Sequence, residues 1–226
     1  MPESRAQSDS SQSECARGVT DAIDPALRQA VTSLSQPGLL VDCRLIGPDD
    51  DRALLQAESA SIASRVIAVR RASGAARIVG RQLMAQLGIP EAAVPKSEDG
   101  APLWPAGIIG SFAHDETIAV AAVGLASVAV SVGVDVEPAI LLPSDLRELV
   151  ATPREKARIG DDPYGGRLLF AVKEAVYKAV HPLDRTFLEY HDIDVDLRRG
   201  TAVVSNGRVV AFRFAVSSHL VVLALA

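Results

Sequence analysis

The most regular pattern of hydrophobic and polar positions lies between residues 128 and 137. Valine occupies every second position there, and the positions between carry small residues followed by Asp135 and Glu137. A period of two predicts a β-strand whose valine face enters a core and whose opposite face ends in two carboxylates. Such a pair suits Mg²⁺, which prefers carboxylate oxygens, although two acids also serve simply to solvate a strand end before Pro138. The pattern alone leaves both interpretations open.

Helical periodicity predicts two long helices. Apolar residues recur at spacings of three and four in residues 166–180, and a similar stripe in residues 70–87 stops at Gly88 and Pro90. Turn residues predict three shorter helices, one that starts at Pro25 and ends by Gly38, one within 48–60, and one after Thr152 with Glu155 completing a capping box. A loop is expected at 96–107. Alternation predicts strands at 39–45, 108–112, 118–123, 201–204, 209–216 and 220–225.

Two hairpins are expected from glycine-containing turns. Gly124 is expected to join the strands at 118–123 and 128–136, and Asn206-Gly207 to join those at 201–204 and 209–216. Helices and antiparallel strands mixed along one chain indicate an α/β (α+β) fold.

The composition is that of an ordinary soluble globular protein. The 226 residues are 48% hydrophobic and 23% charged, with a formal net charge of −5, which disfavours disordered, coiled-coil and polyanion-coating proteins. The serine-rich and acidic segment 1–20 is expected to be a disordered lead-in, and 21–226 to form one folded domain.

A membrane span and a disulfide framework are both disfavoured. Residues 117–134 lack charge, but they contain glycines and serines and end in strand-like alternation, so we reject a transmembrane helix. Cys15 and Cys43 are too few for a disulfide framework or a thiolate zinc site, which fits a reducing, cytoplasmic location.

The basic residues are concentrated in one segment. Residues 59–90 contain no acid, yet they contain five arginines, which are Arg65, Arg70, Arg71, Arg77 and Arg81. Arginine forks at the start of a helix suit the phosphates of a small ligand. A nucleic-acid surface is less favoured because aromatic residues are not interleaved with the arginines. Solvated arginines that pair with acids elsewhere in the fold remain the simpler alternative.

The helix predicted at 166–180 carries a second cluster of charge. Lys173, Glu174 and Lys178 lie away from its apolar stripe, at helical spacings. Glu174 and Lys178 could form an ordinary surface pair, worth about 0.2–0.5 kcal/mol. Alternatively, Glu174 is a third carboxylate for the pair at Asp135 and Glu137. Helical spacing alone leaves the choice open.

These motifs together resemble those of the 4′-phosphopantetheinyl transferases. The two signature segments are GVDVE at 133–137 and FAVKEAVYK at 170–178, and they are supported by PLWP at 102–105, by GSFAH at 110–114 and by the arginine-rich helix from Arg70 to Gly88. The resemblance covers roughly residues 39–216. Length and single-chain organisation are similar to the surfactin- and enterobactin-synthetase-associated branch.

The resemblance implies a fold and a reaction. The fold would be two similar α/β halves, at about 21–125 and 126–226, with the active site between them. The enzyme would use Mg²⁺, or Mn²⁺ in its place, to transfer 4′-phosphopantetheine from coenzyme A to a serine of an apo acyl or peptidyl carrier protein. It would act as a monomer, without nucleic acid or membrane partners.

The resemblance also implies roles for individual residues. Asp135, Glu137 and Glu174 would hold the metal, with Glu174 also accepting the serine proton and Lys173 neutralising phosphate charge. The expected coenzyme A contacts are Arg70, Arg71, Arg77, Lys96, His114, Lys173 and Lys178.

The sequence departs from the family pattern at three positions. Phe170 replaces a common tryptophan, Ala113 a hydroxyl residue, and Asp99 a basic residue. These changes bear on packing and on coenzyme A affinity rather than on the three carboxylates.

Two other functions stay open on the sequence alone. One is a different Mg²⁺-dependent phosphoryl or phosphodiester enzyme, and the other is a non-catalytic module that binds coenzyme A or carrier proteins.

Overall fold

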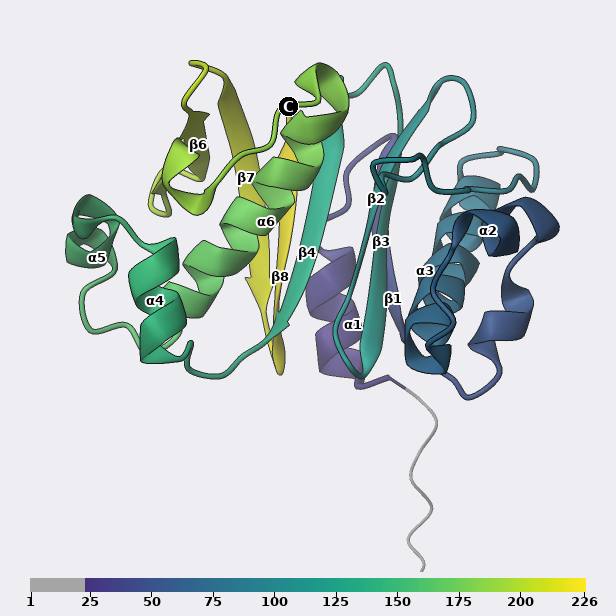
Figure 1. Cartoon of the computed structure of the whole chain (residues 1–226), viewed down its shortest axis with the longest axis horizontal. Helices are drawn as coiled ribbons and strands as arrows, with labels where there is room; N and C mark the ends of the chain where they lie inside the picture. The colour runs from purple at the N-terminus through teal and green to yellow at the C-terminus, as the bar shows by residue number, and fades with distance from the viewer. Residues whose placement is uncertain (1–22) are drawn as a thin grey trace, which may run out of the picture.

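The computed structural model describes residues 23–226, so the lead-in expected at 1–20 lies outside the described residues. The chain forms two antiparallel sheets, with strand orders β1-β3-β2 and β4-β8-β7-β6-β5 (Figure 1). The strands are β1 (Leu39–Leu45), β2 (Ile108–His114), β3 (Ile118–Leu125), β4 (Val132–Pro138), β5 (Ile193–Asp196), β6 (Thr201–Val204), β7 (Val209–Val216) and β8 (His219–Leu225).

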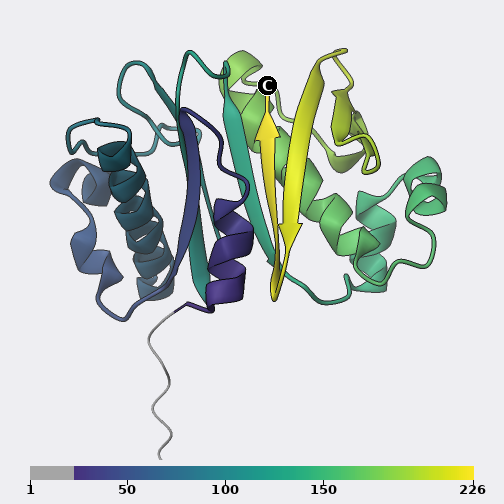
Figure 2. The same cartoon turned by 180° about the vertical axis from the view of Figure 1, so that it is seen from behind.

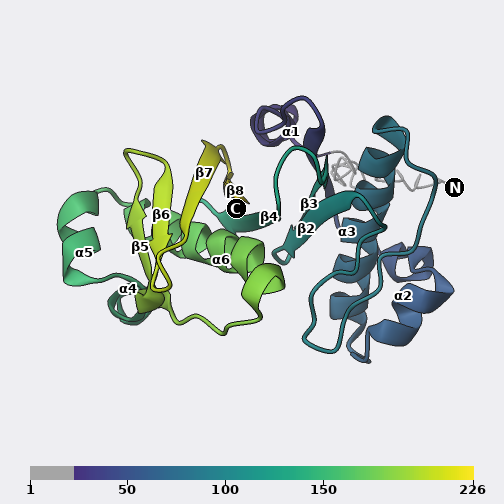
Figure 3. The ribbon, with the colours of Figure 1, turned by 90° about the horizontal axis from the view of Figure 1, so that it is seen from above.

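A long helix covers the outer face of each sheet. These helices are α3 (Ile67–Gln86) on the first sheet and α6 (Gly165–Asp184) on the second (Figure 3). The shorter elements are α1 (Pro25–Thr32), η1 (Asp50–Ala53), α2 (Gln56–Ser61), α4 (Ser144–Val150), α5 (Pro153–Ile159) and η2 (Tyr190–Asp192). The expected mixed fold of two α/β halves is therefore confirmed.

One hydrophobic core is shared by the two sheets. It contains the inner faces of β1 and β3 from the first sheet and of β4 and β8 from the second. Helix α1 contributes Leu27 and Val31 to the same core and lies beside β1 and β7 (Figure 2). The halves therefore stabilise each other by burying a common apolar surface.

Strand β4 confirms the expected alternation over part of its length. Val132, Val134 and Val136 are buried in the shared core, and Asp135 lies on the opposite face, toward α6. The strand begins at Val132, so the predicted start at residue 128 is wrong. Val130 is 71% exposed because residues 126–131 form a turn segment, in which the Val128 amide donates to the Leu125 carbonyl.

The hairpin expected at Gly124 is also wrong. Strand β3 is already paired on both edges, by β1 and by β2, and offers no free edge to β4. Strand β4 instead pairs with β8, with Asp135 opposite Val222. The hairpin between β6 and β7 is confirmed, with Gly207 at a positive φ of 86° in its turn.

Close contact between β4 and α6 depends on Gly133. A Cβ atom at this position would lie 1.9 Å from the Ala175 carbonyl oxygen and 2.7 Å from the Ala179 amide nitrogen. Only glycine permits this approach of strand to helix. Asp135, two residues along the strand, is thereby held against α6.

The predicted helices are confirmed with shifted ends. Helix α3 starts at Ile67, three residues before the predicted start, and α6 continues to Asp184 with Pro182 in its last turn. The capping box at the start of α5 is present, with Thr152 and Glu155 as its two members. None of the helices in residues 23–226 has the length and apolar character of a transmembrane span.

Candidate active site

Asp135 is a buried carboxylate with only one of its two oxygens in a hydrogen bond. It is 6% exposed, and Oδ1 accepts a hydrogen bond of 2.7 Å from Lys178 Nζ. Its other oxygen, Oδ2, is buried and has no hydrogen-bond partner among the described residues. Burial raises the pKa of Asp135 to about 6, against the lowering effect of Lys178, and the nearby acids Glu174 and Glu137 add to the rise.

Glu137 and Glu174 each accept one side-chain hydrogen bond. Glu137 Oε2 accepts from Arg167 Nη1 at 2.7 Å, and Glu174 Oε1 accepts from the Tyr190 hydroxyl at 3.1 Å. Burial raises the pKa of Tyr190 to about 12, and the charge of Glu174 contributes, so the hydroxyl remains protonated and able to donate at neutral pH.

The three carboxylates are electrostatically coupled but are not gathered around one point. No three His, Cys, Asp or Glu side chains within residues 23–226 are grouped closely enough to hold a metal ion as they stand. The donor chemistry nevertheless fits a hard cation such as Mg²⁺, since all three are carboxylates and Asp135 Oδ2 is a buried acceptor with no partner. Ligation by all three would require Glu137 and Glu174 to move closer to Asp135. Arg167 occupies one oxygen of Glu137 and Tyr190 one oxygen of Glu174, so each carboxylate keeps a second oxygen for an ion.

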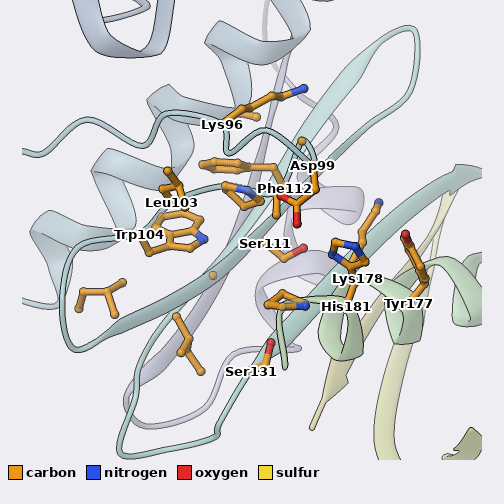
Figure 4. Close-up of a pocket in the computed structure, with 18 of the residues that line it drawn as sticks. Lys96, Asp99, Leu103, Trp104, Ser111, Phe112, Ser131, Tyr177, Lys178 and His181 are labelled. Atoms are coloured by element: carbon orange, nitrogen blue, oxygen red, sulfur yellow. The ribbon is translucent and has the colours of Figure 1, made fainter. Parts of the chain in front are cut away.

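A cavity of about 540 Å³ is lined in part by Lys178, the residue that bonds Asp135 (Figure 4). It is lined from one half of the molecule by α3, β2 and the loop at 96–104, and from the other by Ser131 and the end of α6. Lys178 both lines this cavity and bonds Asp135. Lys178 therefore connects the cavity wall to Asp135, whereas Asp135, Glu137 and Glu174 do not themselves line the cavity.

Cationic and aromatic side chains dominate the cavity wall. The charged or titratable members are Arg77, Lys96, Asp99, His114, Lys178 and His181, and the aromatic members are Trp104, Phe112 and Tyr177. Loss of surrounding water, with smaller contributions from Lys178 and Lys96, lowers the pKa of His114, so its imidazole is neutral at pH 7. A bound phosphate would favour its protonation.

Two donors in this wall are unsatisfied. The Trp104 indole nitrogen and Arg77 Nη2 are buried and have no hydrogen-bond partner among the described residues. Arg77 is otherwise anchored, because Nε donates to the Val94 carbonyl and Nη1 to the Ser73 carbonyl. A buried donor without a partner is costly, so the cavity is suited to a ligand that supplies acceptors.

Comparisons with known proteins show the family of this chain. The family model described as the 4′-phosphopantetheinyl transferase N-terminal domain matches residues 57–124, and that of the 4′-phosphopantetheinyl transferase superfamily matches residues 131–222. The chain belongs to this superfamily.

Three relatives described as 4′-phosphopantetheinyl transferases align with this chain over most of their length. The 4′-phosphopantetheinyl transferase Svp of Streptomyces mobaraensis is 34% identical over 199 residues, covering 79% of this chain and 81% of Svp. The 4′-phosphopantetheinyl transferase Npt of Nocardia iowensis is 35% identical over 176 residues, covering 76% and 79%. The 4′-phosphopantetheinyl transferase PptT of Mycobacterium tuberculosis is 35% identical over 146 residues, covering 61% and 63%.

Four of the seven coenzyme A contacts expected in this phosphopantetheinyl transferase line the cavity, namely Arg77, Lys96, His114 and Lys178. Arg70 and Arg71 do not. Arg70 donates to Ser59 Oγ and to the Ile62 carbonyl, and Arg71 lies 3.7 Å from Asp51. The structure therefore places these two arginines away from the cavity, near the start of α3, and their contact with coenzyme A stays a prediction.

Lys173, another expected coenzyme A contact, also lies away from the cavity. Its side chain is 0% exposed and does not line the cavity. Its ammonium group donates to Glu155 Oε2 and to the carbonyls of Val150 and Tyr190, which uses all three of its N–H groups. Burial lowers the pKa of Lys173, against the raising effect of Glu155. In this geometry Lys173 cannot reach a phosphate in the cavity of this phosphopantetheinyl transferase.

Two residues at the transferase site were not found from the sequence. Arg167 lies seven positions before Glu174 on α6 and contacts Glu137, and Tyr190 reaches Glu174 from η2. Arg167 could have been noticed as a cation on the same helix. Nothing in the sequence around Tyr190 predicts its contact with Glu174, because that contact depends on how the chain folds back toward α6 after the helix ends.

Proposed function

We propose that the protein transfers the 4′-phosphopantetheine group of coenzyme A to a serine of an apo acyl or peptidyl carrier protein, releasing adenosine 3′,5′-bisphosphate. The observation that carries the proposal is the position of Asp135. It is a buried carboxylate with an unpartnered oxygen, and it is bonded to a lysine in the wall of a cationic cavity between the two halves.

Asp135, Glu137 and Glu174 would hold Mg²⁺, or Mn²⁺ in its place. When bound, the ion would polarise the pyrophosphate oxygens and offset negative charge that develops during transfer. Lys178 would then exchange its contact with Asp135 for a phosphate oxygen. Both groups are within reach, because the Lys178 side chain is 29% exposed on the cavity side.

The nucleotide end of coenzyme A would occupy the cavity. The volume of about 540 Å³ falls in the usual range for small-ligand sites. Arg77 Nη2, Lys96 and His114 would meet phosphate oxygens, while Trp104 and Phe112, with ring centroids 4.8 Å apart, offer apolar surface to the base.

Glu174 would accept the proton of the carrier serine. The serine oxygen forms a bond to the phosphorus nearer the pantetheine group, and the bond from that phosphorus to the bisphosphate breaks. A carboxylate is a suitable base because it is half-buried here and is already oriented by Tyr190. A single chain supplies both walls of the cavity, which supports action as a monomer.

The test is to incubate the protein with an apo carrier protein, coenzyme A and Mg²⁺ and to measure the mass of the carrier. The expected product is the carrier with one phosphopantetheine added, formed only when a divalent cation is present. Consumption of coenzyme A without a mass gain on the carrier would instead indicate another phosphodiester enzyme. Binding without either change would indicate a non-catalytic module, and full activity in EDTA would contradict the metal role of the carboxylates.

A further inference from the structure

Tyr190 is held by three residues of α6 at once. Its ring packs against Phe170, with centroids 5.8 Å apart and planes inclined at 46°. Its backbone carbonyl accepts from Lys173 Nζ at 2.8 Å, and its hydroxyl donates to Glu174 Oε1 at 3.1 Å. These α6 positions are spaced three and four apart, so one face of the helix contacts the ring, the backbone and the hydroxyl of a single residue.

Lys173 makes this arrangement rigid. Its buried ammonium joins the Tyr190 carbonyl to Glu155 Oε2 and to the Val150 carbonyl, each at 2.9 Å. Glu155 Oε1 in turn accepts from the Val195 amide at 2.9 Å. The segment that carries Tyr190 is thereby tied to the end of α4, to α5 and to β5.

The hydroxyl of Tyr190 is the one group of this assembly that reaches the candidate active site. A hydrogen bond to an ionised carboxylate is strong when both groups are partly buried, as Tyr190 and Glu174 are. The Tyr190 hydroxyl donates to Oε1 of Glu174. The charge of Glu174 contributes to the raised pKa of Asp135, so the Glu174 carboxylate lies near Asp135.

We propose that Tyr190 is a positioning residue for Glu174, and that Phe170 and Lys173 act on the reaction only through Tyr190. The tyrosine hydroxyl fixes the direction in which the Glu174 carboxylate points, toward Asp135 and the incoming serine. The inference rests on the role proposed above for Glu174. It assigns to Lys173 a structural function in place of a contact with phosphate.

The decisive variant is Tyr190→Phe, which removes the hydroxyl and keeps the ring that packs on Phe170. Tyr164→Phe is the matched control, because Tyr164 precedes α6, is 42% exposed and does not line the cavity. Two quantities are measured, namely the affinity for Mn²⁺ in the presence of coenzyme A, by electron paramagnetic resonance of free Mn²⁺, and kcat with KM for coenzyme A.

The expected result for Tyr190→Phe is a roughly tenfold loss in Mn²⁺ affinity and in kcat, as is typical for the loss of a group that orients a metal ligand. KM for coenzyme A should stay near the wild-type value, because Tyr190 does not line the cavity. Values of Mn²⁺ affinity and kcat equal to those of Tyr164→Phe would overturn the proposal.

A double variant tests whether the hydroxyl acts through Glu174. In a Glu174→Gln background, adding Tyr190→Phe should cause no further loss, because the group that Tyr190 orients has already been altered. An equal, additive loss in that background would show that Tyr190 acts by another route. If Glu174→Gln alone left Mn²⁺ affinity and turnover at wild-type values, the role of Glu174 itself would fail, and this inference with it.

Discussion

The two halves of the molecule each bury a carboxylate beside their long helix, and the two carboxylates are satisfied very differently. Glu58, next to α3, is 0% exposed and accepts hydrogen bonds from Arg81 and from the amides of Leu55 and Val94. Asp135, next to α6, is bonded through one oxygen to Lys178, and its other oxygen is unpartnered. The first arrangement is complete, whereas the second has capacity for a further ligand.

The comparison shows why burial alone does not identify a functional acid. Both groups are taken out of water, and both face cations on a helix. What distinguishes them is the count of donors around each oxygen, since a fully bonded carboxylate supports the fold and an incompletely bonded one binds something else. Five variants at buried or partly buried acids test and sharpen this distinction, from the largest expected effect to the smallest.

Glu58→Gln should lower the free energy of unfolding by about 3–5 kcal/mol, because it leaves the guanidinium of Arg81 without its buried counter-charge. Urea denaturation measures the loss. Turnover per folded molecule should fall less than stability, since Glu58 does not line the cavity and reaches it only through Arg77, 3.9 Å away. A variant as stable as wild type would show that the hydrogen bonds to Glu58 matter little.

Asp135→Ala should reduce carrier modification by about 100-fold or more, since it removes the buried oxygen that we propose as a metal ligand. The protein should remain folded by circular dichroism. A variant that unfolds would make Asp135 structural, like Glu58.

Asp135→Asn separates charge from shape. Burial raises the pKa of Asp135 to about 6, so the ionised group destabilises the metal-free fold above that pH. The wild type should therefore gain stability relative to Asp135→Asn as the pH falls from 7.5 to 5. Thermal unfolding in EDTA at both pH values measures the change, and a wild type that loses stability relative to Asp135→Asn as the pH falls would contradict it.

Asp115→Asn should destabilise the protein by about 0.5–1.5 kcal/mol at pH 7. Asp115 Oδ2 lies 2.8 Å from His219 of β8 and so joins the two halves. Burial alone would raise the pKa of Asp115, but hydrogen bonds from His219, Ile118 and Thr117 outweigh it and hold the pKa well below its usual range. A depressed carboxyl pKa stabilises above the unfolded value, so the deficit of the variant should disappear as the pH falls below about 4. Urea denaturation at several pH values measures it, and a deficit independent of pH would rule out the charge.

Asp99→Asn should have the smallest effect. Asp99 lines the cavity and pairs with Arg185, but the arginine side chain is 65% exposed, so the pair adds little stability. Removing its negative charge should raise coenzyme A affinity about two- to threefold at low ionic strength, with less effect in high salt. Calorimetric titration at two salt concentrations measures this, and weaker binding would assign Asp99 a direct contact with the ligand.

Local periodicity was sufficient for much of the site. The alternation around Asp135 correctly predicted which side chains of β4 face the core and which lie on the opposite face. The helical spacing correctly placed Glu174 and Lys178 outside the apolar stripe of α6. The superfamily was correctly predicted from the motifs that contain these residues. These features depend on neighbours within a few residues, which a single sequence displays directly.

Features that depend on distant chain segments could not be predicted. Lys173 and Glu174 are adjacent on the helix, yet one enters a buried network with Glu155 and the other lies near Asp135. The partners of the arginines at the start of α3 could not be named from the sequence, because Ser59 and Asp51 belong to α2 and η1. The edge partner of β4 was likewise set by the packing of the second sheet.

The pairing of β4 with β8 has a consequence for the rate of folding. The strand that carries Asp135 must wait for His219–Leu225, which is separated from it by all of α4, α5 and α6 and by β5, β6 and β7. Long-range strand pairing carries a large entropic barrier and is slow to form. Until β8 pairs with it, both edges of the valine-rich strand β4 are open to other chains, whereas the folded sheet leaves one edge of β4 unpaired. Refolding should therefore be slow and dependent on protein concentration, and the carboxylate site should be assembled after the helices have formed.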